Sequence, residues 1–227
     1  MKTLTHYIQE KLIIKKSKRI EYKYFPKTSK ELQNIIRQRI EQEGNEVDLN
    51  DIDVSNITNM EGLFWKTDFN GNISNWDVSN VTEMNSMFSG CKSFNGDLSN
   101  WDVSKVNDMS YMFAGCNKFN QDISAWDVSN TEDMSNMFYD CNKFNQNIYK
   151  WNVSKVTNMS YMFAWCKLFN KDISKWDVFK VTDMEGMLYM CTSFNHDISN
   201  WDVSNVKDYR YVFDDCPIEE KYKPKFK

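Results

Sequence analysis

Tryptophan recurs in this chain every 25 residues, and that spacing constrains the fold more than any other feature of the sequence. The members of the series are Trp76, Trp101, Trp126, Trp151, Trp176 and Trp201. A regular repeat of this length is typical of a solenoid, in which no repeat can bury its apolar face alone and neighbouring repeats stack. We therefore expect one elongated stack whose interior consists of columns of equivalent side chains.

Each repeat carries the same apolar pattern. Residues 98–103 have the spacing of a leucine-rich-repeat strand, with Trp101 and Val103 on one face and Asp102 on the other. Apolar residues between 106 and 116 then follow at the spacing of one helical face. The pattern predicts a short parallel strand and a short helical turn in every repeat.

The chain divides into three parts. About seven repeats cover residues 49–216, and the first of them is atypical because it lacks the tryptophan and the cysteine of the others. Residues 1–48 precede them as a capping element, with a helix predicted from the capping box at Thr28 to about Glu43. Residues 217–227 form a charged tail, which we expect to be solvated.

The unit WDVSNVTEMNSMFSGCKSFNGDLSN (76–100) and its copies resemble the repeats of BspA-like leucine-rich-repeat proteins, including their mycoplasma-type branch. The resemblance extends over residues 49–216. It implies a right-handed α/β solenoid that serves adhesion or protein binding. Many proteins of that family lie on the cell surface, whereas this chain shows no export signal.

Charge is unevenly distributed along the chain, although the net charge is only −4. The basic segment 11–30 contains a single acidic residue, Glu21, and is either a solvated run or a site for an acidic partner or nucleic acid. The N-terminus lacks the apolar core of a secretory signal, and no segment is apolar enough to span a membrane. We expect a cytoplasmic protein with a protein partner and no membrane contact.

The sequence does not indicate catalysis, a metal site or a cofactor. It contains no phosphate-binding glycine loop and only two histidines, His6 and His196. Six cysteines share one position of the repeat: Cys91, Cys116, Cys141, Cys166, Cys191 and Cys216. Without converging ligands, we interpret them as buried thiols rather than metal ligands or disulfides.

Two further columns have structural interpretations. Paired methionines such as Met109 and Met112 lie at helical spacing beside phenylalanine, which favours core packing over an adaptable Met-rich groove. Asparagine follows the last phenylalanine of each repeat, as at Asn120, and is predicted to bond the backbone of the next repeat.

Two columns of aspartate are the candidate partner-binding residues. The Asp102 column comprises Asp77, Asp102, Asp127, Asp177 and Asp202, with Asn152 in the remaining repeat. The Asp97 column comprises Asp97, Asp122, Asp172 and Asp197, with Asn147 in the remaining repeat. Each aspartate either bonds the nearby backbone in an Asx-type turn or belongs to an acidic stripe that awaits a cationic partner. Both alternatives stay open at the level of sequence.

The first ten residues, MKTLTHYIQE, resemble the capsid-targeting leaders of tailed-phage internal head proteins, which are cut after a glutamate. An ordinary amphipathic helix also explains their pattern. Two function classes follow: a non-enzymatic protein-binding scaffold with an acidic face, and a structural or packaged component of a larger assembly such as a virion.

Overall fold

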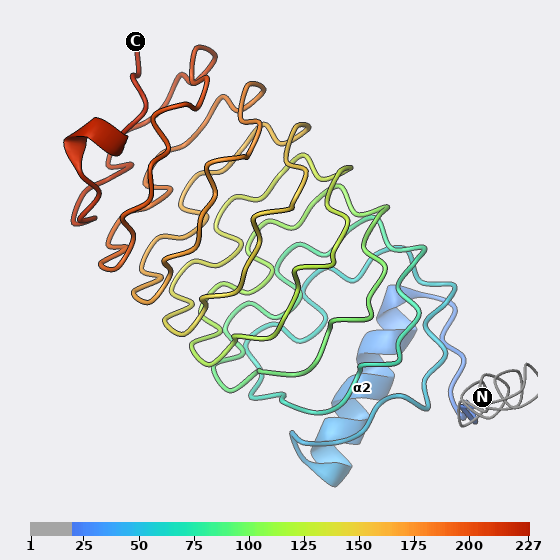
Figure 1. Ribbon diagram of the computed structural model, residues 1–227. Helices are drawn as coiled ribbons and strands as arrows, with labels where there is room; N and C mark the ends of the chain where they lie inside the picture. The colour runs from blue at the N-terminus through green and yellow to red at the C-terminus, as the bar shows by residue number, and fades with distance from the viewer. Residues whose placement is uncertain (1–19) are drawn as a thin grey trace, which may run out of the picture.

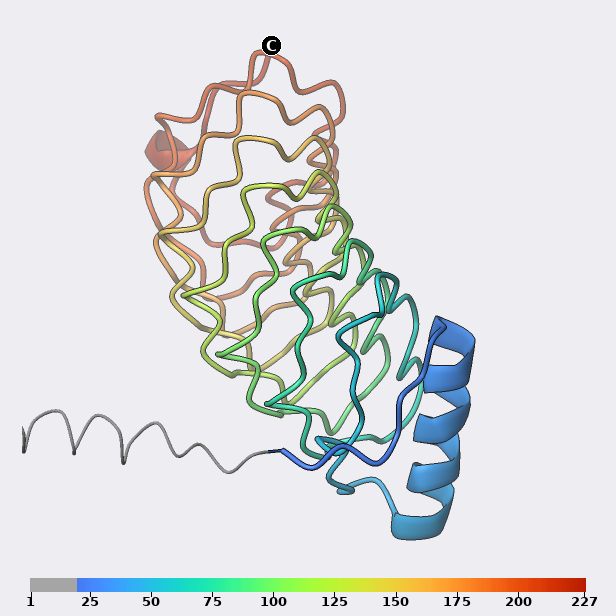
Figure 2. The same cartoon turned by 90° about the vertical axis from the view of Figure 1, so that its right-hand side faces the viewer.

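The computed structural model describes residues 20–227. Helix α2 spans Ser29–Glu43, and the short 3₁₀ helix η1 spans Glu220–Tyr222. Between them the chain winds into a stack of similar coils, each made by about 25 residues (Figure 1). Helix α2 lies across the first coils at one end of the stack, as the turned view shows (Figure 2). From residue 20 onward no other helix and no continuous strand occurs.

Neighbouring coils are joined by parallel backbone bonds along one segment. Isolated parallel bridges connect Asn59, Glu83, Asp108, Asp133, Asn158, Asp183 and Asp208 in succession. The N–H groups of Met109 and Tyr111 donate to carbonyls of the next coil at 3.0 and 2.8 Å, whereas Met112 N–H donates back to Met109 O at 3.2 Å. The segment is therefore a run of tight turns in which alternate N–H groups bond the next coil.

The bridges do not lie where the sequence pattern places the strand. In the expected strand 98–103, Trp101 N–H closes a turn onto Leu98 O at 3.1 Å instead of bonding a neighbouring coil. The expected helical turn at 106–116 is also not formed, because Tyr111 and Gly115 have left-handed φ values of 56° and 74°. A right-handed helix cannot pass through such residues, and local turns consume the N–H groups that a ladder would need.

The interior consists of stacked aromatic columns. Phe113 lies 4.0 Å from Phe119 in its own coil and 5.7 Å from Phe138 in the next, measured between ring centroids. The indole N–H of Trp126 donates to Leu98 O at 3.0 Å, so the buried tryptophan leaves no orphan donor. The methionine pairs are fully buried in the same core, as predicted. Coil-to-coil packing thus accounts for the strict repeat period.

Two columns of side chains form hydrogen bonds between coils, one of asparagines that accept and one of cysteines that donate. The predicted asparagine ladder is confirmed: Asn120 N–H donates to Oδ1 of Asn95 at 2.9 Å, and the other coils repeat the bond. The cysteines are free thiols, and all but Cys216 are buried. Cys141 Sγ donates to Phe113 O at 2.9 Å, a contact that recurs along the column and that the sequence did not indicate.

The two ends of the stack are finished differently. Helix α2 begins after Thr28, whose side chain accepts from Glu31 N–H, and ends at Gly44 with φ 88°, as the capping pattern predicts. The tail 217–227 packs in part against the last coil instead of being solvated as expected, because its Phe226 ring stacks on that of Tyr209 with 4.5 Å between the ring centroids. An aromatic residue in a charged tail can bury its ring against the last coil while its lysines stay in water.

Candidate functional site

The Asp102 column lies on the surface, with every carboxylate exposed. Oδ1 of Asp102 accepts the backbone N–H of Ser104 at 3.0 Å, an Asx turn that closes the bend after the buried Trp-x-Val segment. The same bond occurs at Asp77, Asp127, Asn152, Asp177 and Asp202. The predicted local backbone bond is therefore present in every coil of the column.

The Asp97 column has the same geometry. Oδ1 of Asp97 accepts the N–H of Ser99 at 2.9 Å. Its counterparts at Asp122, Asn147, Asp172 and Asp197 accept equivalent bonds. Both columns thus flank the buried tryptophan segment, which makes turns instead of the sheet face that was expected there.

Asp102 and Asp97 remain ionised at neutral pH. Hydrogen bonds from Ser104 hold the pKa of Asp102 below its ordinary value, and those from Ser99 do the same for the pKa of Asp97. Lys105 Nζ donates to Asn80 Oδ1 of the preceding coil at 2.7 Å, and its positive charge adds to the lowering of the Asp102 pKa. The second carboxylate oxygen of Asp102 has no hydrogen-bond partner among residues 20–227.

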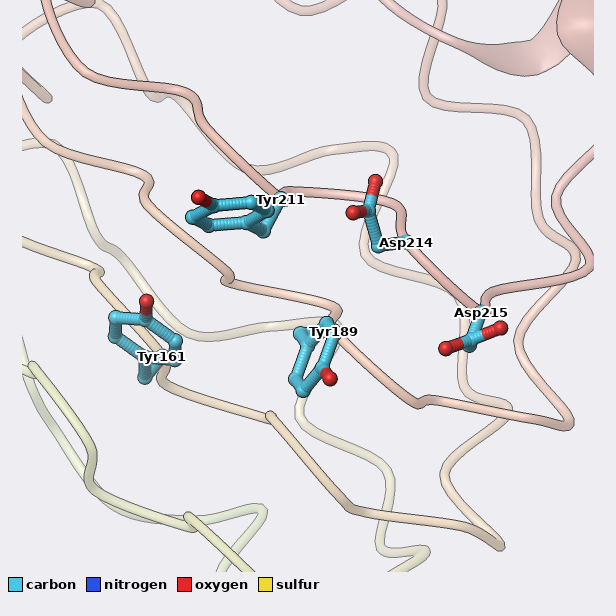
Figure 3. A pocket seen from close by; sticks show the side chains of 5 residues that line it. All are labelled: Tyr161, Tyr189, Tyr211, Asp214 and Asp215. Carbon is cyan, nitrogen blue, oxygen red and sulfur yellow. The ribbon is translucent and has the colours of Figure 1, made fainter.

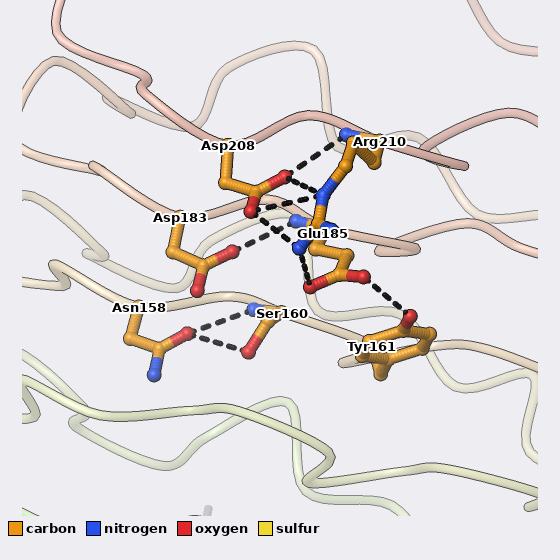
Figure 4. Close-up of polar contacts among 7 residues, drawn as sticks. All are labelled: Asn158, Ser160, Tyr161, Asp183, Glu185, Asp208 and Arg210. Atoms are coloured by element: carbon orange, nitrogen blue, oxygen red, sulfur yellow. Dashed lines mark hydrogen bonds and ion pairs between the residues drawn. The ribbon is translucent and has the colours of Figure 1, made fainter.

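Sequence reasoning missed a third aspartate column on the bridged segment. Oδ1 of Asp108 accepts Ser110 N–H at 2.8 Å, and Asn158 accepts from Ser160 in the same way (Figure 4). The signal was available, because Asp-x-Ser occurs three times in the coil that starts at Asp97. Three Asx turns per coil explain why aspartate and serine recur on its corners.

The repeat breaks on the outer surface of the last three coils. Tyr161, Tyr189, Tyr211, Asp214 and Asp215 line an open hollow of about 380 Å³, called here the tyrosine hollow. Figure 3 shows the three rings coming from three successive coils, with both aspartates toward one side. Aromatic faces beside carboxylates are suited to a cationic group.

One wall of the tyrosine hollow is held by a polar network (Figure 4). The hydroxyl of Tyr161 donates to Glu185 Oε1 at 2.9 Å, and Arg210 bridges the other Glu185 oxygen and Asp208 at 2.8 Å each. Burial and then the hydrogen bond to Glu185 raise the pKa of Tyr161 to about 12. The ring of Tyr161 therefore has a fixed orientation and keeps its proton at neutral pH.

Other sequence predictions concern residues or features away from these surfaces. The leader-like residues 1–10 and residues 11–19 of the basic segment 11–30 lie outside the described residues, whereas Lys23 of that segment forms an ion pair with Asp51 at 3.3 Å. Within residues 20–227 no group of three or more potential metal ligands converges. In the same range, no helix combines the length and apolarity that crossing a membrane requires.

Parallel bonds between coils, columns of like side chains and the 25-residue period define a repeat protein. Two overlapping stretches, residues 30–146 and 121–223, match the family described as "Mycoplasma protein of unknown function, DUF285". The chain belongs to this family, and the matched residues cover nearly all of the described coils. No curated protein resembles the chain closely enough to count as a match.

Proposed function

We propose that this protein is a non-enzymatic, protein-binding scaffold, built as a right-handed leucine-rich-repeat-like solenoid of the BspA-like kind. In this proposal the Asp102 and Asp97 columns form an acidic face for a basic partner. The observation that carries the proposal is that the two oxygens of an exposed carboxylate differ. Oδ1 of Asp102 accepts the N–H of Ser104, whereas the second oxygen has no hydrogen-bond partner among residues 20–227.

Preorganisation supports the binding role. A carboxylate held by a backbone N–H does not lose rotamer freedom when a partner arrives, so less entropy opposes association. Columns of like charge also repel one another, and a basic partner relieves that repulsion. The stacked interior keeps the aspartates at a constant spacing, which suits a partner with regularly placed basic side chains.

Replacing Asp102, Asp127 and Asp177 together by asparagine tests the acidic face. Asparagine retains the Oδ1 acceptor, and Asn152 already occupies this column with the same backbone bond, so the coils keep their turns. Partners captured from the native source and identified by mass spectrometry are expected to be lost or strongly depleted with the triple variant.

A matched control removes the same charge from a different column. Asp108, Asp133 and Asp183 replaced by asparagine lose three charges on the bridged segment, where Asn158 is the natural precedent. This control is expected to capture the same partners as the unmodified protein. Full capture by the Asp102, Asp127 and Asp177 variant would refute the acidic face as the binding surface.

A further inference from the structure

The ring of Tyr161, which lines the tyrosine hollow, packs over a glycine at one slot of the repeat. The slot of Gly186 holds Gly62, Ser86, Tyr111, Asn136, Tyr161 and Tyr211 in the other coils. A Cβ on Gly186 would lie 2.6 Å from Cδ1 of Tyr161 and closer still to its Cε1, so the ring lies directly over this glycine. The ring of Tyr161 therefore occupies the space that a side chain at position 186 would need, and it lines the hollow together with Tyr211 (Figure 3).

The uncompensated charge at the tyrosine hollow is negative. Arg210, the cation beside it, already pairs with both Glu185 and Asp208. Asp214 and Asp215 are exposed, and neither carboxylate pairs with another residue in the part of the chain that the structure describes. A cationic ligand would therefore meet two available carboxylates and three aromatic rings.

Lysine already lies over aromatic rings elsewhere on this surface. Lys66 Nζ is 4.3 Å from the ring centroid of Trp65, which occupies in its coil the slot of Tyr189. Lys167 Nζ is 5.8 Å from the ring of Trp165, and that ring packs edge-on against Tyr189. No cation of residues 20–227 lies over the rings of Tyr161, Tyr189 or Tyr211 in this way.

We propose that the tyrosine hollow binds the side chain of a lysine presented by a protein partner. The aliphatic stem packs against the tyrosine rings, and the ammonium group lies between their π faces and the carboxylates of Asp214 and Asp215. The proposal rests on the scaffold function in needing a protein partner, but its residues are separate from the Asp102 and Asp97 columns. The two surfaces can therefore fail independently.

Nuclear magnetic resonance of the full chain, labelled with ¹³C on its tyrosine rings, tests the lysine site. The probes are two short blocked peptides, acetyl-Gly-Lys-Gly-amide and the same peptide with norleucine, which has a similar apolar stem and no ammonium. The lysine peptide is expected to shift the resonances of Tyr161, Tyr189 and Tyr211 with a dissociation constant of about 1 mM or weaker. The norleucine peptide is expected to leave them unchanged.

Gly186→Ala and Gly62→Ala form a matched pair of variants. Both glycines occupy the same slot with left-handed φ values of 56° and 57°, so the backbone strain of alanine is the same. Only at Gly186 does the new Cβ displace Tyr161, because at Gly62 the nearest atom is 3.7 Å away. Gly186→Ala is expected to abolish the lysine-dependent shifts, and Gly62→Ala to retain them.

Charge removal completes the test. The double change Asp214→Asn and Asp215→Asn is expected to weaken lysine-peptide binding about fivefold or more without changing the fold. Equal shifts with the norleucine peptide, or equal behaviour of Gly186→Ala and Gly62→Ala, would overturn the proposal. The Asp102, Asp127 and Asp177 variant is expected to bind the peptide normally, so a failure of the acidic face is distinguished from a failure of the hollow.

Discussion

The interior of the coils and the surface of the last three coils follow opposite rules. Inside, most slots hold the same or a similar residue from coil to coil, as Phe113 stacking on Phe138 at 5.7 Å illustrates. Outside, the slot that contains Tyr161 changes to Gly186 and then to Tyr211, and both tyrosines line a hollow. Stacking demands uniformity of the buried columns, whereas recognition of a specific ligand requires a local departure from the repeat.

The largest difference between the interior and the surface of the coils is expected in the reactivity of their cysteine thiols. Burial raises the pKa of Cys91 to about 11 and that of Cys141 well above the ordinary thiol value, so neither forms thiolate at neutral pH. Iodoacetamide is expected to modify only the partly buried Cys216 in the folded protein and all six thiols in 6 M guanidinium, as counted by mass spectrometry. Fast labelling of Cys141 in the folded state would contradict the sealed interior.

Truncating an interior ring should cost much more stability than truncating a surface ring. Phe113→Ala removes a fully buried ring that stacks on Phe88 and Phe138 of its own column and on Phe119, and it is expected to lower the free energy of unfolding by about 3–5 kcal/mol. Tyr111→Ala is the control, because that ring is 47% exposed, and the expected loss is less than about 1 kcal/mol. Urea denaturation followed by tryptophan fluorescence measures both, and similar losses would erase the contrast.

Acid should weaken the coils through their Asx turns. The pKa values of Asp97, Asp102 and Asp122 are lowered by hydrogen bonds in the folded state, so the folded protein binds protons more weakly than the unfolded chain. Their stabilising contribution is complete above the unfolded pKa of about 4 and is lost as pH falls through the lower folded values. The urea midpoint is expected to fall between pH 5 and pH 2, and a flat profile would exclude this contribution.

The smallest effect is expected at a single surface turn. Asp102→Ala removes the acceptor of Ser104 N–H and should lower the free energy of unfolding by about 0.5–1 kcal/mol. Asp102→Asn keeps the acceptor and should fall within about 0.5 kcal/mol of the unmodified protein. A loss for Asp102→Ala but not for Asp102→Asn would show that the bond accepted by Oδ1 stabilises the fold and would leave the second oxygen available for binding. Equal losses for both variants would show that charge, rather than the turn, stabilises the coil.

Much of the interior was predictable because identical residues recur at identical spacing. The period, the buried tryptophan and methionine columns, the asparagine ladder and the limits of helix α2 at Thr28 and Gly44 were all predicted from residue type and position. The two aspartate columns were also identified, but their role was left open between an Asx-type turn and an acidic binding stripe. A sequence does not show which carboxylate oxygen is already bonded.

Only the tertiary structure decided where the coils bond one another and where the surface departs from the repeat. The spacing at 106–116 resembles that of a helical face. Residues with left-handed φ such as Tyr111 prevent a helix there, and the segment instead bonds the neighbouring coils. The tyrosine hollow depends on residues that are far apart in the sequence: Tyr161 packs over Gly186, 25 residues later, and lines the hollow with Tyr211, 50 residues later. It also depends on the ring orientation that Glu185 fixes. Sequence by itself determined which residues recur and are buried, because burial follows chemical type. Backbone conformation and contacts between coils determined the surface, because they arise only when the coils are stacked.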